Sequence, residues 1–354
     1  MKNIFRWITA GVFLLLTALV AAAAKHLPDL VFSFYPDFSR AVLSAISKVS
    51  ALCPVPVWEL VLAGLILGFL ISLVLSICKG HFLRWLSKLA LFLSVMVFLF
   101  VGLWGLNYYA PPIQERLSLP DEQYTVSQLK EAACYYRDMA NLTSQQVQRD
   151  EEGHYVSAPF GELAQAVGTG FEALSGRYDC FCGSTAPPKK LLSSPLLAKT
   201  GTTGIFICYT AESGVSSETY PVSLPFTMCH EVGHRMAFAR EDEANFAAFL
   251  ACMASDREDF RYSGYYNAFL YCYNALYKVD REAAQEILSG VSQNLKTDLS
   301  QATEHYAQRR SETAAQVTDK VYDTYLKSFS VEEGVQSYGE VADLLLIWYF
   351  EVLP

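Results

Sequence analysis

Three long uncharged runs of hydrophobic residues dominate the first third of the chain. They cover residues 7–24, 60–78 and 89–106. Each run has about 18 residues, which is the length that a helix needs to cross a bilayer. The pattern therefore predicts three transmembrane helices. A cleaved signal peptide is the alternative for the first run, because Lys2 and Arg6 precede it and Ala22–Ala24 is similar to a cleavage site.

Shorter periodic segments replace these runs after residue 107. Apolar side chains recur at helical spacing in 126–140 and 160–171, while 204–210 is rich in β-branched and aromatic residues. We therefore expect a mainly α fold with a small β element, placed after the three transmembrane helices. The natural division is a membrane region at 1–107 and a second domain at 108–354.

Composition agrees with this division. The chain has 354 residues, of which 52% are hydrophobic and 18% charged, so it is too apolar for an ordinary soluble protein and too polar to lie wholly in a membrane. Its formal net charge is −9, and the second domain has no basic cluster. We therefore expect the lipid bilayer as one partner and no binding to nucleic acid.

Basic residues in the short polar segments predict the orientation. They are Lys2 and Arg6 before the first run, and Lys79, Arg84 and Lys88 in the loop between the second and third runs. Segments enriched in lysine and arginine stay in the cytoplasm. We therefore expect a multi-pass protein of the cell membrane, with 25–56 and everything after 107 outside the cytoplasm.

The first predicted outer loop has a helical pattern of its own. Its apolar residues are Phe38, Ala41, Val42, Ala45, Ile46, Val49 and Leu52. This spacing indicates a helix that lies on the membrane surface or packs on the spans, or else an ordinary loop helix.

The cysteines do not indicate a disulfide framework. Of the nine, seven lie in the second domain, and that odd number is atypical of a secreted scaffold. Cys229 and Cys252 fall in apolar segments and are expected to be small core residues. Cys180 and Cys182 leave metal binding or a disulfide open, although an ordinary role is favoured.

The segment Cys229-His230-Glu231-Val232-Gly233-His234 carries the densest chemistry of the second domain. On a helix, His230 and His234 leave the same face one turn apart, which suits a zinc ion. Glu231 lies close enough to take a proton from a metal-bound water. Apolar residues flank the motif on both sides, so its polar groups are expected to be buried and to need partners.

A catalytic zinc site needs a third protein ligand, and Glu241 and Glu243 are the candidates. They lie about 200° apart around a helix, so both cannot face one ion. Glu243 would be solvated at the helix start, where negative charge is favourable. Only six residues separate His234 from Glu241, so the chain must turn between them, and this turn contains no glycine.

HEVGH followed by REDEANFAAFLAC resembles the zincin peptidases, among them the ImmA/IrrE-like and HtpX/Ste24-type families. It is also similar to a bacterial family of membrane proteins of unknown function, with N-terminal spans, HExxH, EDEAN and a C-terminal SYG segment, here Ser337–Gly339. The resemblance implies an α+β zincin-like metallopeptidase domain. It implies that Glu241 is the third zinc ligand and that Asn245 supports a ligating histidine.

These features predict a zinc metallopeptidase. Zn²⁺ held by His230, His234 and Glu241 would activate water, and Glu231 would be the catalytic base. The partner would be a peptide or protein substrate, with membrane and envelope proteins among the possibilities. The strand at 204–210 would either hold this substrate along its edge or pack only on the core.

The alternative is a non-catalytic membrane scaffold or sensor with a structural or vestigial zinc site. A structural site would favour a fourth protein ligand, often a cysteine, but Cys229 points away from the two histidines on a helix. Tyr262, Tyr265 and Tyr266 either include a donor for the oxyanion or belong to the aromatic core, and the core is favoured. His305 is expected to be solvated.

Overall fold

A computed structural model of the chain describes residues 2–328 and 338–353. Its long N-terminal helices are α1 (Lys2–His26), α4 (Val57–Cys78) and α5 (Phe82–Leu103). Within the described residues, these three are long and apolar enough to cross a membrane. The three spans expected from the hydrophobic runs are therefore confirmed by length and composition, and the protein is a membrane protein.

Two boundaries differ from the expectation. The third span ends at Leu103, because the aromatic segment after it forms a short 3-10 helix, η1 (Gly105–Tyr109), that is largely buried. The loop before this span is only residues 79–81, so Arg84 and Lys88 lie in the first turns of α5 and not in a loop. Gly80 makes so short a turn possible, since its φ of +64° is unfavourable for other residues.

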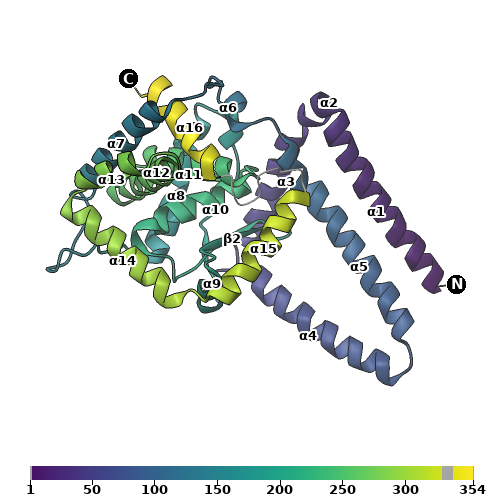
Figure 1. Cartoon of the computed structure of the whole chain (residues 1–354). Coiled ribbons are helices and arrows are strands. Elements are labelled where there is room, and N and C mark those ends of the chain that lie inside the picture. The colour runs from purple at the N-terminus through teal and green to yellow at the C-terminus, as the bar shows by residue number, and fades with distance from the viewer. Residues whose placement is uncertain (1, 329–337, 354) are drawn as a thin grey trace.

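The spans do not form a tight bundle. Helix α1 runs beside α5, whereas α4 diverges from α5 beyond their connecting turn (Figure 1). Near that turn, Trp85 packs against Phe69 with tilted rings and donates a hydrogen bond to Ser72 Oγ over 2.9 Å. Helices α2 (Pro28–Phe32) and α3 (Tyr35–Ser50) connect α1 to α4 on the side of the second domain. The predicted loop helix is therefore present as α3.

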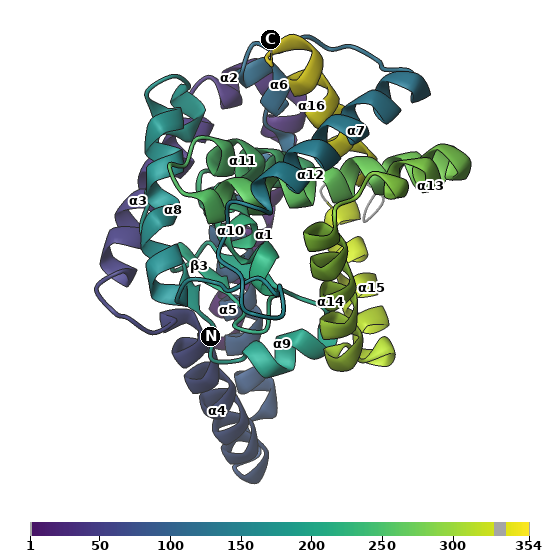
Figure 2. The same cartoon turned by 90° about the vertical axis from the view of Figure 1, so that its left-hand side faces the viewer.

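The second domain is a helical body around a small sheet (Figures 1 and 2). Its helices are α6 (Ile113–Arg116), α7 (Val126–Thr143), α8 (Phe160–Ser175), η2 (Asp179–Phe181), α9 (Ser194–Thr200), η3 (Pro221–Ser223), α10 (Leu224–Arg235), α11 (Glu241–Met253), α12 (Glu258–Val279), α13 (Arg281–Ser289), α14 (Gln293–Arg309), α15 (Glu312–Ser328) and α16 (Tyr338–Glu351). Its strands are β1 (Lys189–Lys190), β2 (Gly204–Ile207) and β3 (Glu212–Val215). The expected mainly α fold with a small β element is therefore confirmed. Ser337 of the SYG segment lies outside the described residues.

The sheet has the order β1-β3-β2, so within residues 2–328 and 338–353 strand β2 pairs only with β3 and lies at an edge. Strands β2 and β3 are antiparallel, and their connection places β2 beside α10, the helix of the HEVGH motif. On the other side of α10, helix α11 packs into the core between α8, α12 and α16. Close contact is needed there: a Cβ at Gly170 of α8 would lie 2.1 Å from the carbonyl oxygen of Ala251. The motif helix is thus held between an edge strand and the core.

Candidate metal centre

The turn between α10 and α11 brings the two halves of the motif together. Two backbone hydrogen bonds close it, from Ala237 N–H to His234 O (3.0 Å) and from Phe238 N–H to Gly233 O (3.2 Å). This pair of bonds is a Schellman motif, which usually has glycine at the left-handed position. Here Ala237 adopts that conformation, with a φ of +70°. The turn that lacks glycine is therefore made by a small residue under backbone strain.

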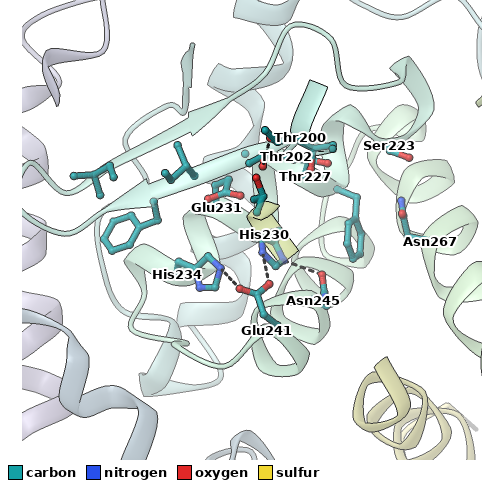
Figure 3. Close-up of a pocket in the computed structure, with 18 of the residues that line it drawn as sticks. Thr200, Thr202, Ser223, Thr227, His230, Glu231, His234, Glu241, Asn245 and Asn267 are labelled. Carbon is teal, nitrogen blue, oxygen red and sulfur yellow. Dashed lines mark hydrogen bonds and ion pairs between the residues drawn. The ribbon is translucent and has the colours of Figure 1, made fainter. Parts of the chain in front are cut away.

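His230, His234 and Glu241 lie together on the facing sides of α10 and α11 (Figure 3). The Glu241 carboxylate is 3.2 Å from His230 Nε2 and 3.4 Å from His234 Nε2. All three side chains are largely shielded from solvent, although Glu241 stays 28% exposed. Three atoms that can ligate a metal therefore converge on one point.

The far side of each ring has an acceptor. His230 Nδ1 is 2.8 Å from Asn245 Oδ1, and His234 Nδ1 is 2.8 Å from the backbone oxygen of Phe238. A neutral imidazole that donates from Nδ1 leaves a lone pair on Nε2. Both lone pairs would then face the Glu241 carboxylate, an arrangement that requires a proton or a cation between them. Hydrogen bonds of this kind orient the histidine ligands of metal sites.

The spacing suits zinc. Two ligand atoms bound to zinc at about 2.1 Å on a tetrahedron are about 3.4 Å apart. The nitrogen–oxygen distances of 3.2 and 3.4 Å match this value. Two imidazoles and one carboxylate are also a donor set of catalytic zinc sites, in which a fourth position stays open. The residues present therefore fit the ion that the sequence predicts.

Charge interactions dominate the electrostatics of this cluster. Burial alone would raise the pKa of Glu241, but His234 and His230 hold it well below its usual value. Burial alone would lower the pKa of His234, but the Glu241 carboxylate raises it to about 9. The two shifts have one origin, since a carboxylate and an imidazole stabilise each other's charged forms. The pocket therefore favours positive charge opposite Glu241.

Glu231 lies beside the three candidate ligands and points toward strand β2 (Figure 3). The residue is only 4% exposed, and its Oε2 has no hydrogen-bond partner in the part of the chain that the structure describes. Burial raises the pKa of Glu231 to about 7. A carboxylate in this state can both take up and release a proton near neutral pH.

Gly204 in β2 makes room for the Glu231 side chain. A Cβ built at Gly204 would lie 2.3 Å from Glu231 Oε1, which is closer than atoms can approach. The backbone of α10 is linked to the sheet as well, because Ser213 Oγ in β3 donates to Glu231 O over 2.7 Å. The sheet therefore determines where the Glu231 carboxylate lies.

A cavity of about 900 Å³ opens over this cluster. Strand β2 forms one wall of the cavity, which reaches Phe100 in the third span and Trp104 just beyond its end. Trp104 also donates a hydrogen bond from Nε1 to His234 O, over 3.0 Å. Sequence reasoning did not find these two residues, because they belong to an apolar run about 130 residues before the motif.

Other lining residues were also missed. They are Asn267 and Tyr271 of α12, Tyr306 of α14, and Arg310 after α14. Arg310 forms an ion pair with Asp319 over 3.3 Å at the same cavity. For Asn267 the sequence contains one signal, which is the helical spacing of the apolar residues around it. This spacing places the polar Asn267 side chain on the buried face of α12.

The expectation that Glu243 is solvated is wrong. Glu243 is 1% exposed and points away from the histidines into a cluster of arginines. Its carboxylate accepts hydrogen bonds from Ile113 N–H (2.9 Å) and Arg116 Nη2 (2.7 Å), and it also pairs with Arg240. The cause is the segment around α6, which packs over the start of α11 and could not be placed by spacing alone. Glu243 is thus a structural anchor for α6.

Cys229 does not join the metal-ligating cluster. It is buried, and its Sγ lies 3.9 Å from Cys252 Sγ of α11. All nine cysteines have free thiols in the structure, including Cys180 and Cys182. The described residues thus place no cysteine among the ligand atoms that converge on Glu241.

The three tyrosines of α12 belong to the core. Tyr262 and Tyr266 are buried, Tyr265 packs against Tyr135 and Phe249, and none of them lines the cavity. The hydroxyl of Tyr262 bonds to Asp298, which is fully buried. The prediction that His305 is solvated is wrong, because its Nε2 lies 2.7 Å from Glu218 O on a partly buried face.

Fold and site together define a membrane-anchored, mainly helical protein with a shielded His–His–Glu cluster. Over residues 34–346 the chain matches the family described as "Protein of unknown function (DUF3810)". This match covers most of the chain, so the chain belongs to that family, and two of the three spans lie within the matched region. No curated protein and no solved structure matches the chain.

Proposed function

We propose that this protein is a membrane-anchored, zinc-dependent metallopeptidase. The observation that carries the proposal is the convergence of His230 Nε2, His234 Nε2 and the Glu241 carboxylate, with an acceptor behind each ring. These three residues would hold Zn²⁺, and Asn245 would orient His230. A bound zinc ion would polarise the scissile carbonyl group of the substrate and lower the pKa of the attacking water.

Glu231 is the general base in this proposal. It takes a proton from the attacking water and returns it to the leaving amine. Its burial and its raised pKa suit both steps, and its unpartnered oxygen supports a position reserved for a reactant. A residue that only ligated a metal or filled the core would not need this arrangement.

Strand β2 is the proposed substrate wall. It lies at the sheet edge and lines the cavity, and an extended peptide could pair with such an edge through backbone hydrogen bonds. The substrate would accordingly be a peptide or a protein segment in extended form. The bias of basic residues supports an extracytoplasmic position for the domain. Envelope and membrane proteins would then be within its reach.

The scaffold or sensor alternative has less support. A structural zinc site usually has four protein ligands. Among the described residues, this cluster offers three, and Cys229 is directed at Cys252 instead. A buried Glu231 with an unpartnered oxygen has no purpose in a structural site.

The test uses the full-length protein purified in detergent. Metal analysis should find about one zinc ion per chain, and a library of fluorogenic peptides should be hydrolysed. Glu231→Gln should keep the zinc but lose hydrolysis by about 10²–10⁴-fold, because only the proton acceptor is removed. Glu286→Gln is the matched control, since this exposed glutamate pairs with Lys130 at the surface of the domain. Equal turnover by Glu231→Gln and the wild type would rule out the proposed mechanism.

A further inference from the structure

The exposed face of helix α3 is mainly apolar, with Asp37 and Lys48 at its edge, whereas its buried face includes polar side chains. The residues that it buries against the rest of the protein are Tyr35, Ser39, Arg40, Leu43 and Ser47. The exposed apolar side chains along and just beyond it are Phe38, Ala41, Ala45, Val49 and Leu52, which we call the outer stripe. An ordinary surface helix shows the reverse pattern, with polar residues facing water.

The two faces of α3 lie on opposite sides of the helix. With about 100° between successive residues, the outer stripe occupies an arc of roughly 80°. The buried positions centre roughly 160° away from it. The buried face contacts the second domain, where Ser184 Oγ donates to Ser47 Oγ over 3.0 Å and Leu43 packs in a cluster with Cys208 and Ala239. The outer stripe therefore points away from the domain.

Both ends of α3 are held where the spans end. At its start, Tyr35 donates to Val101 O (3.2 Å) and Ser39 donates to Leu103 O (2.7 Å), in the last turn of α5. At its end, Lys189 Nζ donates to Ser50 O over 2.7 Å, and the next span begins at Val57. Figure 1 shows α3 along the border between the second domain and the spans. The helix thus follows the level at which the apolar spans stop.

We propose that α3 is an interfacial helix whose outer stripe is buried in the bilayer, at the boundary between headgroups and acyl chains. Lipid is the occupant that the structure favours, because α3 is linked to the first span through α2 and to the second through residues 51–56, and it is bonded to the end of the third. Such helices bury an apolar face about 5–10 Å into this boundary. Exposed Lys48 flanks the stripe and can reach lipid phosphates.

This contact would set the height of the metal centre above the membrane. The buried face of α3 packs with Trp104 and Ala239, and Trp104 holds the backbone of His234. The second domain would therefore rest on the bilayer through α3, in addition to its covalent connections to the spans. The inference does not depend on the proposed peptidase activity.

The test places a genetically encoded fluorescent amino acid at position 45, and in a second protein at position 49. A matched control carries it at position 142, because Leu142 is also an exposed apolar residue and belongs to α7, which lies away from the spans (Figure 1). The full-length proteins are reconstituted into vesicles of phosphatidylcholine and phosphatidylglycerol. Quenching is measured with acyl chains brominated near the headgroup and with aqueous iodide.

Lipid bromine should quench the labels at 45 and 49 but not the label at 142, and iodide should quench only the latter. Equal quenching of all three labels by iodide would show that the stripe faces water, which would overturn the proposal. Protection from both quenchers, varying with the ratio of protein to lipid, would show that a second copy covers the stripe, and this would overturn it too. Two separate label positions guard against a single variant that fails to fold.

Discussion

Glu241 and Glu243, two residues apart in one helical turn, should fail in opposite ways when each is changed to glutamine. Glu241 is partly exposed and faces the two histidines, so Glu241→Gln should weaken zinc binding with little loss of stability. Glu243 is buried among Arg116, Arg240 and the backbone of Ile113, so Glu243→Gln should keep the zinc but destabilise the fold.

The expected magnitude for Glu243 follows from its partners. Arg116 is 12% exposed, and its Nε and Nη1 have no hydrogen-bond partner among the described residues. The ion pair with Glu243 is therefore the main interaction that offsets the free-energy cost of burying the Arg116 guanidinium. Removing one partner of a buried ion pair costs about 3–5 kcal/mol. Glutamine still accepts from Ile113 N–H, so the lower end of this range is expected. For a domain of this size, about 3 kcal/mol corresponds to a fall of roughly 6–12 °C in Tm.

Both variants are measured as full-length protein in detergent, by zinc content after dialysis and by thermal unfolding. Glu286→Gln serves as the control, because it breaks a solvent-exposed pair with Lys130 and should change Tm little. Loss of zinc from Glu243→Gln at temperatures where it remains folded would refute the assignment of Glu241 as the ligand. A normal Tm for Glu243→Gln would refute the argument about the buried arginines.

Three further outcomes are expected. Gly204→Ala should displace the Glu231 carboxylate and so reduce peptide hydrolysis, while the zinc content stays normal. Turnover and zinc content are measured on the same preparation. Unchanged turnover would contradict the role of strand β2 in positioning Glu231. Asn245→Ala should weaken zinc about 10–100-fold in competition with a chelator, whereas Asn245→Asp should not, because aspartate still accepts from His230. A reporter tag near residue 150 should be reached from outside intact cells and one at 79–81 should not; protection of the first would place the domain in the cytoplasm.

Local pattern accounts for what could be predicted along the chain. A helix that crosses a bilayer must be apolar over its whole length, so the three spans are visible in the sequence alone. The spacing of His230 and His234, and of Glu241 and Asn245, follows from the 3.6-residue period of a helix. These are short-range relations, and the structure brings all four side chains together.

The boundaries were less predictable, because they depend on packing. Hydropathy extends the third run through Leu106, yet the helix stops at Leu103 since the following aromatic residues are buried against the second domain. In the same way, Arg84 and Lys88 read as loop residues although they lie on α5.

The sequence by itself determined the membrane region, the helical character of the second domain and the residues of the candidate metal site. Only the tertiary structure decided how these parts meet. Ala237 takes a left-handed turn that sequence statistics reserve for glycine, and this turn places the Phe238 carbonyl behind His234. Three contacts come from segments distant in sequence. Gly204 makes room for Glu231, Trp104 bonds to the backbone of His234, and Arg116 pairs with the buried Glu243. Periodicity describes contacts within a helix, but contacts between distant segments depend on how the whole core packs.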